Sequence, residues 1–566
     1  MTAPETSTRA DLVRGQPRFL DDDVAATARI GGDAAAWRLL VQRHGARAPE
    51  HVRGAFAVAL ALEGGRSFLA VDRFGQGTLC WRQDAQGTLH WSARADALAG
   101  AAATGSDEAL DPQALYDYLY FHAIPAPRTV FRGVFRLPAA HVLWHERGAA
   151  EPRAWWVPHF TSPATGDFEA LKAEFRTLLA RAVERQLRGA PLACYLSGGT
   201  DSSTVAGLIA QVAGTPPHSY SIGFEAEGYD EMAYARLASK RFGTTHHEYY
   251  VTPDDLVRWI PSVAQTYDQP FGNSSALPAF CCARMAFDDG VRHILAGDGG
   301  DELFGGNARY AKQRLFGVYQ RVPGVLRRGL MEPLLLHTPL GRLPGLKKGA
   351  SYVEQARVPL PARLQMYNLL LRLDPAQVLT PEFRARVSQE AVLQHQQAVW
   401  DAPHATTELD RQLAYDWRYT LADSDLPKVV GTAALAGLTV GFPLLDEDLA
   451  DFSMKLPESY KLRGQALRWF FKEALRGFLP DEIITKSKHG FGLPFGVWAT
   501  RHEGLKALAE DSLRSLAQRG IVQPAFIDTL LRTHLPAHPS YYGEMVWVLM
   551  MMEQWMRGRS ADGVTV

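Results

Sequence analysis

Small and acidic residues follow an apolar stretch near residue 195, and their order suits phosphate binding. The segment 193–196 is typical of a buried strand, and the apolar segment 205–212 is typical of a buried helix. The loop between them contains two glycines, which let an anion approach the backbone. The N–H groups that open a helix point toward such an anion. The pattern therefore predicts a strand, a tight loop and a helix that bind phosphate, with these contact residues: Ser197, Gly198, Gly199, Asp201 and Ser202.

Asp201 indicates that a cation accompanies the phosphate. The P-loop motif requires a lysine after its second glycine, whereas Thr200 follows Gly199 in this chain. A carboxylate within a phosphate loop repels the anion unless a cation lies between them. Mg²⁺ binds carboxylate and phosphate oxygens together. We therefore expect Asp201 to hold Mg²⁺.

The S-G-G-x-D-S sequence at residues 197–202 resembles the signature of the PP-loop ATP pyrophosphatases. These enzymes split ATP between its α and β phosphates to form adenylates. The resemblance implies ATP and Mg²⁺ as cofactors. For the hexapeptide alone, a simple Gly-Ser turn before a helix is the structural alternative.

A second acidic loop, D-G-G-D-E at residues 298–302, follows another predicted buried strand. Loops at the ends of parallel strands lie over a nucleotide, and carboxylates this dense repel one another unless a cation or an ammonium group is near. The loop closely resembles the one that follows the PP-loop in asparagine synthetases. We expect Asp298 to act on the amine, Asp301 to bind metal, and Gly297 and Gly299 to contact the nucleotide. A solvated acidic turn is the alternative.

Three more positions are candidates. The strand predicted at 218–224 would place Ile222 near the base of the nucleotide. Asp268 lies in a segment that resembles a family segment, and is a candidate second Mg²⁺ ligand. The Lys-x-Gly-Phe sequence that begins at Lys488 resembles the family loop whose lysine reaches the reacting carbonyl and the pyrophosphate. A fixed cation there would stabilise charge in the transition state, whereas a solvated lysine pair is the alternative.

Residues 39–143 resemble the later half of the glutaminase domain of asparagine synthetases. Alternating apolar residues at 55–61 and 67–71 predict a hairpin in a β-rich layer. That glutaminase uses an N-terminal cysteine thiol as its nucleophile, whereas position 2 here is Thr2. We expect a degenerate glutaminase-like layer that is kept as a scaffold. The alternative is an amidohydrolase that acts through the Thr2 hydroxyl.

A chain of 566 residues is too long for one core. We expect a degenerate glutaminase-like domain at 1–158 and a PP-loop synthetase domain at 168–560. The fold class would be α/β: a β-rich, truncated Ntn-type layer, then a parallel α/β domain similar to the adenine nucleotide α hydrolases, with a helical C-terminal part. His246 and His247 are neighbours on a predicted strand, so their side chains should point to opposite faces and not share a metal.

The charge and amino-acid composition of the chain indicate which kinds of binding partner to expect. The net charge is −1 and no basic tract alternates with aromatic residues, so we expect no nucleic-acid or anionic-membrane partner. The sequence has no apolar run long enough to predict a membrane span. The apolar tail 541–556 is expected to pack within the protein core. The four cysteines lack metal-ligand spacing and predict buried free thiols in a reducing, cytoplasmic setting: Cys80, Cys194, Cys281 and Cys282.

The resemblance implies an ATP- and Mg²⁺-dependent ligase that forms an amide from a carboxylate and an amine without its own glutaminase. The β-lactam synthetases and lasso-peptide cyclases are similar in this respect. Family positions that usually carry charge are Val430, Gly431, Thr439 and Gly441 here, so a pocket larger and more neutral than one for aspartate is expected. A peptide or a secondary metabolite, brought by a partner protein, would fit such a pocket.

Two other functions stay open at this stage. One is an asparagine synthase-type amidotransferase that uses ammonia or a partner's glutaminase. The other is a nucleotide-binding regulator without catalysis, which the intact residues Ser197, Asp201, Asp298 and Lys488 oppose.

Overall fold

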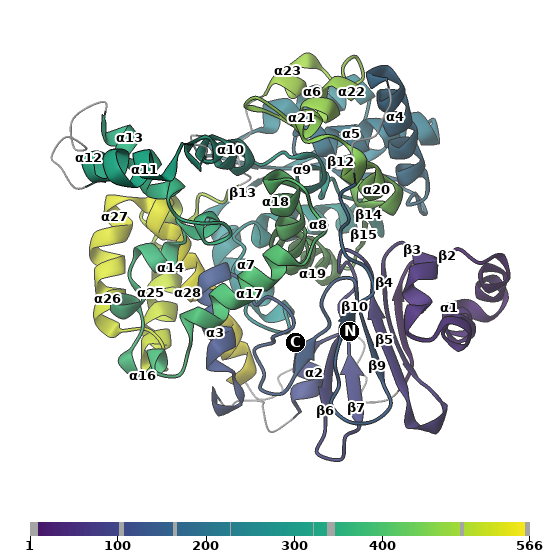
Figure 1. Cartoon of the computed structure of the whole chain (residues 1–566), viewed down its shortest axis with the longest axis horizontal. Coiled ribbons are helices and arrows are strands. Elements are labelled where there is room, and N and C mark those ends of the chain that lie inside the picture. The colour runs from purple at the N-terminus through teal and green to yellow at the C-terminus, as the bar shows by residue number, and fades with distance from the viewer. Residues whose placement is uncertain are drawn as a thin grey trace.

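The computed structural model describes residues 10–100, 107–161, 167–226, 228–320, 322–336, 346–486 and 492–560. They form a β-rich N-terminal domain, a parallel α/β domain and a group of C-terminal helices (Figure 1). This arrangement confirms the expected fold class. Thr2 and Lys488 lie outside the described residues.

The N-terminal domain is built on an antiparallel sheet buried on both faces. Alternate residues of β4 point in opposite directions, so Phe56 and Val58 pack beneath Trp37 of α1, while Ala57 and Ala59 face Trp81 of a second, smaller sheet. The predicted hairpin is confirmed, because β4 and β5 pair antiparallel. The main sheet has the order β1-β4-β5-β9-β10 and the second has the order β7-β6-β8. Their bounds are β1 Leu12–Gly15, β4 Phe56–Ala61, β5 Ser67–Val71, β6 Cys80–Gln83, β7 Leu89–Ser92, β8 Phe135–Arg136, β9 His141–His145 and β10 Arg153–Ala154; α1 is Asp22–His44.

One loop of the N-terminal domain enters the core of the other domain. The buried carboxylate of Asp72 accepts hydrogen bonds from four backbone N–H groups, including those of Phe74 (3.0 Å) and Gly77 (2.9 Å). This clamp fixes the loop so that Phe74 meets the Trp417 ring edge-on at 5.8 Å, within the core of the α/β domain. Arg73 beside it pairs with Asp451 at 2.7 Å. The two domains therefore share apolar core as well as ion pairs.

The second domain contains a five-stranded parallel sheet. Its order is β13-β12-β11-β14-β15, and every neighbouring pair of strands runs parallel. The sequence predicted strands at 193–196 and 218–224 and a helix after residue 204, and the structure confirms each of them. The strands are β11 Ala193–Tyr195, β12 His218–Phe224, β13 Thr245–Val251, β14 His293–Leu295 and β15 Thr439–Gly441.

Helices cover both faces of this sheet. One face carries α4, α5 and α6, and the other carries α7, α8 and α19. As predicted, His246 and His247 point apart: His246 meets Ser219 (Nδ1 to Oγ, 2.9 Å), and His247 meets His218 (Nε2 to Nδ1, 3.0 Å). The helices are α4 Phe168–Glu184, α5 Thr200–Ala213, α6 Met232–Phe242, α7 Pro253–Thr266, α8 Ala276–Asp288 and α19 Leu426–Ala436.

The C-terminal helices enclose an apolar central helix, α28 (Pro539–Ser560). Its stretch 545–552 is fully buried against α7, α24 and α25, which confirms that the apolar tail packs as core. The surrounding helices are α24 Phe495–Ala499, α25 Glu503–Gln518, α26 Pro524–Thr529 and α27 Leu535–Ala537, with the π-helical turn η10 Leu530–His534.

Shorter elements connect these parts. The region 315–411, where the sequence predicted nothing specific, is helical and includes an extension formed by α10 to α13 (Figure 1). The connecting elements are β2 Arg18–Phe19, η1 Gly45–His51, β3 Val52–Arg53, η2 Glu63–Gly65, α2 Ala95–Ala99, η4 Asp107–Ala109, α3 Pro112–Phe121, α9 Gly300–Phe304, α10 Ala308–Gln320, α11 Gly324–Leu326, η5 Arg327–Met331, α12 Glu332–Leu336, α13 Leu346–Ala356, η7 Ala362–Gln365, α14 Leu369–Arg372, α15 Pro375–Val378, α16 Pro381–Arg384, α17 Gln389–Asp401, α18 Glu408–Asp416, η8 Trp417–Asp425, η9 Pro443–Leu445, α20 Glu447–Lys455, α21 Glu458–Lys461, β16 Leu462–Arg463, β17 Ala466–Leu467, α22 Trp469–Ala474 and α23 Asp481–Thr485.

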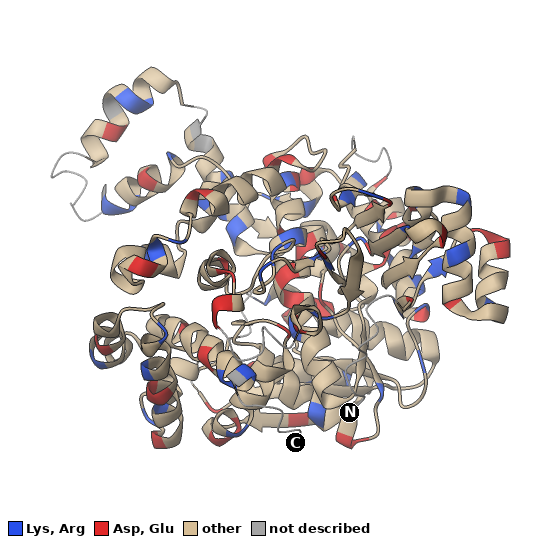
Figure 2. Cartoon of the chain, turned by 90° about the horizontal axis from the view of Figure 1, so that it is seen from below, with Lys and Arg blue, Asp and Glu red and all other residues tan. Residues whose placement is uncertain are grey.

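Charge is spread over the described surface. Figure 2 shows basic and acidic residues interspersed along the helices. None of the helices that the structure describes is both long enough and apolar enough to span a membrane.

A buried carboxylate joins the two domains. Glu447, at the start of α20, accepts a hydrogen bond from the Gly54 N–H of the N-terminal domain at 2.6 Å. Burial raises the pKa of Glu447 to about 7, against the opposing effect of its backbone hydrogen bonds, and the nearby Asp446 adds to the rise. Because the folded protein binds this proton more tightly than the unfolded chain, the resulting stabilisation is complete below about pH 4.5 and is lost as the pH rises through about 7.

Glu447→Gln should therefore stabilise the protein at pH 8.5 and leave it nearly unchanged at pH 5. A neutral amide can still accept the Gly54 N–H bond, and it avoids burying a charge. We expect a rise of the melting temperature on the order of 2 °C at pH 8.5, measured by differential scanning fluorimetry. Glu169→Gln, at an exposed glutamate of α4, is the control. An equal effect of Glu447→Gln at both pH values would contradict the assignment.

Candidate active site

The two loops that the sequence singled out lie side by side at the carboxyl edge of the parallel sheet. From β11 the chain continues to β12 and β13 on one side, and then crosses to β14 and β15 on the other. The strand order therefore reverses between β11 and β14, which pair directly through Cys194 and Leu295. Ligands of open α/β sheets bind at such a switch point. The loops 196–199 and 296–299 both emerge there.

The first loop is compact and held by its own side chains. Ser202 closes it, because its Oγ accepts the Ser197 N–H at 3.1 Å and lies 3.0 Å from Ser197 Oγ. Gly198 has φ +70°, and a Cβ there would lie 2.5 Å from the backbone nitrogen of Ala235. Glycine is therefore required by both conformation and space. Gly199 precedes the first turn of α5, so the free N–H groups of the helix face this loop.

Glycine also lets the second loop approach the first. A Cβ on Gly297 would lie 2.7 Å from the backbone nitrogen of Ser202, and one on Gly299 would overlap Leu445. The two loops thus approach each other where Gly297 meets Ser202.

A single arginine joins the two loops. The Arg468 guanidinium forms ion pairs with both oxygens of Asp201 and, at 2.8 Å, with Asp301. It also donates to Thr200 Oγ1 at 3.0 Å and lies over the Phe471 ring, 4.1 Å from its centre. Arg468 is 5% exposed, so these pairs are shielded from water. The carboxylates of two of the three predicted metal ligands, Asp201 and Asp301, converge on one cationic group.

Sequence reasoning missed Arg468. The density of acidic residues predicted that a cation must lie near, but nothing identified which one. Arg468 lies 167 residues beyond Asp301, at the start of α22 after the β16–β17 hairpin. The aromatic residues 469–471 that follow Arg468 were the one sequence feature that could have indicated a buried helix beginning there.

Asp298 belongs to a second charged group. Lys428 lies with its Nζ 2.9 Å from Asp425 Oδ1 and 3.9 Å from Asp298 Oδ1. Burial raises the pKa of Asp298 to about 6; Lys428 opposes this shift, while Asp425 and Asp201 add to it. Burial lowers the pKa of Lys428, but Asp425 and Asp298 outweigh burial and raise it. A carboxylate with such a pKa can accept and release a proton near neutral pH.

A cavity of about 590 Å³ is a candidate substrate pocket. It is bounded by α3, α14, the π-helical segment η8 and the start of α28, and Ser424 on its wall directly precedes Asp425. Its charged wall residues include Arg309 and Asp416, which pair with each other. Most of its wall is aromatic or neutral, and the aromatic residues are Tyr120, Phe121, Tyr367, Tyr415, Tyr419 and Tyr541.

Other predicted positions lie elsewhere. Asp268 pairs with Arg136 of the N-terminal domain at 3.1 Å and accepts the Ala95 N–H at 2.8 Å. Both of its oxygens are used at the domain interface, which argues against the predicted role as second Mg²⁺ ligand. Val430 and Gly431, expected to line the substrate pocket, border a cavity of about 130 Å³ at that interface.

Ile222 lies half-buried in β12, two residues before its end. Its predicted contact with the nucleotide base stays a prediction. The predicted catalytic residue Lys488 falls outside the described residues, so its placement also stays a prediction. Lys486, the last described residue before that gap, pairs with Glu231 at 2.9 Å.

Comparison with known families agrees with this geometry. Residues 174–557 match the family model described as asparagine synthase, and residues 26–156 match the model described as glutamine amidotransferase domain. The chain belongs to the asparagine synthase family. The family places it among the ATP-dependent carbon–nitrogen ligases, and the N-terminal domain is amidotransferase-like.

Similar proteins carry the same description. A putative glutamine-hydrolysing asparagine synthetase of Mycobacterium tuberculosis (strain ATCC 25618 / H37Rv) is 26% identical over 536 residues, which cover 93% of this chain and 79% of that protein. The glutamine-hydrolysing asparagine synthetase 1 of Bacillus subtilis is 22% identical and covers 80% of this chain and 69% of its own length. A putative asparagine synthetase of Methanocaldococcus jannaschii is 33% identical over 39% of this chain and 43% of its own length.

Arg468→Gln should make the fold depend on Mg²⁺. Loss of one partner from a buried ion pair costs about 3–5 kcal/mol, because the remaining charges are uncompensated. We expect a lower melting temperature in metal-free buffer, and a larger stabilisation by Mg²⁺ in the variant than in the wild type, since Mg²⁺ can replace the guanidinium between Asp201 and Asp301.

The measurement is the melting temperature with EDTA and with millimolar Mg²⁺. Arg463→Gln, in the neighbouring hairpin with its guanidinium over Trp469, is the matched control. If Mg²⁺ stabilised Arg468→Gln no more than the wild type, Mg²⁺ would not replace the guanidinium between the two aspartates.

Proposed function

We propose that this ligase activates a carboxylate as an acyl-adenylate and joins it to an amine without hydrolysing glutamine. ATP would be split into AMP and pyrophosphate, and the amine would displace AMP to form an amide. The observation that carries this proposal is the convergence of Asp201 and Asp301 on one cation at the switch point, beside a glycine loop at a helix N-terminus. A loop of this kind supports phosphate, and paired carboxylates support its metal.

These residues fit the nucleotide and the metal. Backbone N–H groups at residues 198–202 would bind the phosphates, and Asp201 and Asp301 would hold Mg²⁺. The bound Mg²⁺ would neutralise phosphate charge as pyrophosphate leaves. Arg468 would keep the two carboxylates oriented, and we assign no metal-binding role to Asp268. Lys488 keeps its predicted role as a fixed cation near the reacting carbonyl.

The aromatic cavity supports a substrate larger than aspartate. Its volume of about 590 Å³ is within the range of small-molecule sites, and its Arg309 and Asp416 charges are already paired. A free dicarboxylate would need unpaired cationic partners on that wall. A peptide or secondary metabolite with an activated carboxylate fits this chemistry. That a partner protein delivers this substrate is part of the proposal.

Buried cysteines support the absence of glutaminase activity. Such activity needs an accessible thiolate, whereas each of the four cysteines in this sequence is buried. Burial raises the pKa of the thiols of Cys80, Cys194 and Cys281 to about 12, and that of Cys282 further. Thiols with raised pKa values are largely protonated near neutral pH, and this supports the proposal.

Asp201→Asn should abolish adenylate formation without unfolding the protein. We expect ATP–pyrophosphate exchange, screened over a panel of aliphatic, aromatic and peptide carboxylates, to fall at least about 10²-fold when the carboxylate that holds the metal is lost. Asp254→Asn, at an aspartate with an 88% exposed side chain, is the control. Release of ADP in place of AMP, or efficient asparagine formation from aspartate and ammonia, would contradict the proposal.

Asp298→Asn should separate the two half-reactions. Above a pKa of about 6, Asp298 is ionised and can accept a proton from the attacking ammonium group. We therefore expect the wild-type kcat/KM for amide formation to fall as the pH drops through about 6. In the variant, pyrophosphate exchange should persist, while amide formation slows by about 10²–10³-fold and loses this acid limb.

Rapid-quench analysis of AMP and amide product measures both steps. An equal loss of pyrophosphate exchange and amide formation in Asp298→Asn would remove the proposed role in amine attack.

A further inference from the structure

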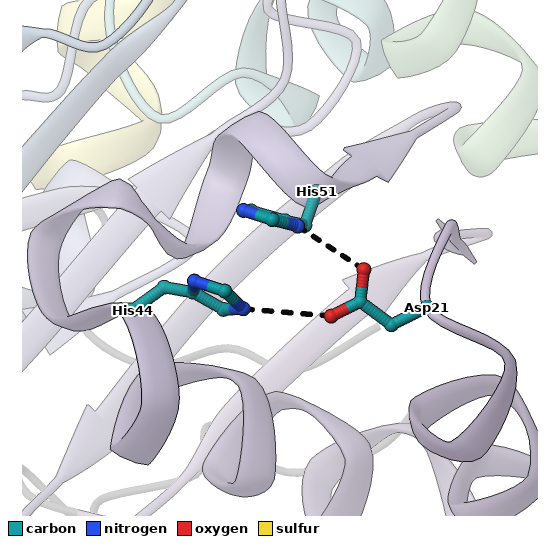
Figure 3. Close-up of side chains that lie close together, drawn as sticks. All are labelled: Asp21, His44 and His51. Atoms are coloured by element: carbon teal, nitrogen blue, oxygen red, sulfur yellow. Dashed lines mark hydrogen bonds and ion pairs between the residues drawn. The ribbon is translucent and has the colours of Figure 1, made fainter.

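Three metal-ligating side chains meet in the N-terminal domain, in a place that the ligase reaction does not use. Among the residues that the structure describes, Asp21, His44 and His51 form the group whose ligand atoms all lie within 4.8 Å of one another. Asp21 precedes α1, His44 is the last residue of α1, and His51 is the last residue of η1. Figure 3 shows both imidazoles directed at the two oxygens of the Asp21 carboxylate.

The donor spacing suits a small tetrahedral ion. His51 Nδ1 lies 3.1 Å from Asp21 Oδ1, and His44 Nε2 lies 3.4 Å from Asp21 Oδ2. Donors bound to Zn²⁺ at about 2.0–2.1 Å in a tetrahedron are about 3.3 Å apart. His44 Nε2 is shielded from solvent and makes no hydrogen bond with the described residues. The structure thus aims a solvent-shielded nitrogen at the carboxylate.

The local fold holds the three residues in place. Strands β2 and β3 pair Phe19 with Val52, and the Leu20 N–H donates to the His51 carbonyl at 3.0 Å, so Asp21 and His51 are fixed beside each other. His44 is fixed because the preceding turn of α1 is anchored in the core by Leu40 and Val41, which are buried. The rings of His44 and His51 stack with centres 3.7 Å apart. The site is therefore organised before any ligand arrives.

We propose that Asp21, His44 and His51 bind one Zn²⁺ ion that fastens the end of α1 to the β2–β3 pair. Two imidazole nitrogens and one carboxylate are ligands that Zn²⁺ favours over Mg²⁺, which prefers oxygen. Water completes the coordination, because the three side chains are partly exposed. The nucleotide site differs in kind, since its predicted metal ligands are carboxylates alone.

The test is metal binding by the full chain after removal of metal with a chelator. Titration of Zn²⁺ against a chromogenic chelator should show one tight site per chain, and Co²⁺ at that site should give the visible absorption of tetrahedral nitrogen and oxygen ligation. His51→Gln and Asp21→Asn should each weaken Zn²⁺ binding by more than about 100-fold, because loss of an outer-sphere partner alone costs about 10–100-fold. Zn²⁺ should raise the melting temperature of the wild type and not of these variants.

His90→Gln is the matched control, because His90 pairs with Asp84 at 2.8 Å in the same domain without a third ligand. It should bind Zn²⁺ as the wild type does. Circular dichroism confirms that each variant is folded, and the Co²⁺ spectrum of the wild type is independent of any variant. Absence of a tight site in the wild type, or unchanged binding in folded His51→Gln and Asp21→Asn, would show that the three residues form an ion-pair cluster without metal.

Discussion

The site depends on the Arg468 guanidinium that is held between Asp201 and Asp301. The parallel sheet brings the two loops together, but carboxylates that lie close together repel each other unless a cation is near. The arginine removes this repulsion. Arg468 itself has φ +55°, a conformation that costs a non-glycine residue on the order of 1 kcal/mol and that its ion pairs can offset. The β16–β17 hairpin, which presents Arg468, is therefore as important to the site as the two loops.

Local patterns were enough to predict the strands β11, β12 and β14, the helix α5 and both acidic loops. In each case the information lies within about a dozen consecutive residues: an apolar run, then glycine and a small polar residue, then an apolar helix. The hairpin of β4 and β5 and the buried tail helix were predicted for the same reason. The presence of a positive charge beside Asp201 and Asp301 was also predicted, because neighbouring acidic residues need a counter-charge.

Partners distant in the chain could not be predicted. The pairing of Arg468 with Asp201, and of Asp268 with Arg136, depends on how whole elements dock. The segment around Asp268 resembles a family segment, but it does not reveal which residues of the N-terminal domain contact Asp268. The aromatic cavity has walls from α3, α14, η8 and α28, so no single stretch of sequence encodes it. The approach of Asp21 to His51 likewise follows from the β2–β3 register.

The Asp72 clamp, which holds Phe74 in the core of the α/β domain, limits where the gene can recombine with those of its relatives. Phe74 is encoded with the N-terminal domain but belongs physically to the core that supports Trp417, where the cavity-lining segment η8 begins. Recombination between relatives at the apparent domain linker would therefore separate side chains that must match in shape. Two parental genes can be exchanged without separating this pair only if Phe74 and Trp417 come from the same parent. One aromatic ring of the N-terminal domain completes the core of its neighbour, so this domain is under selection for packing whether or not it carries an activity of its own.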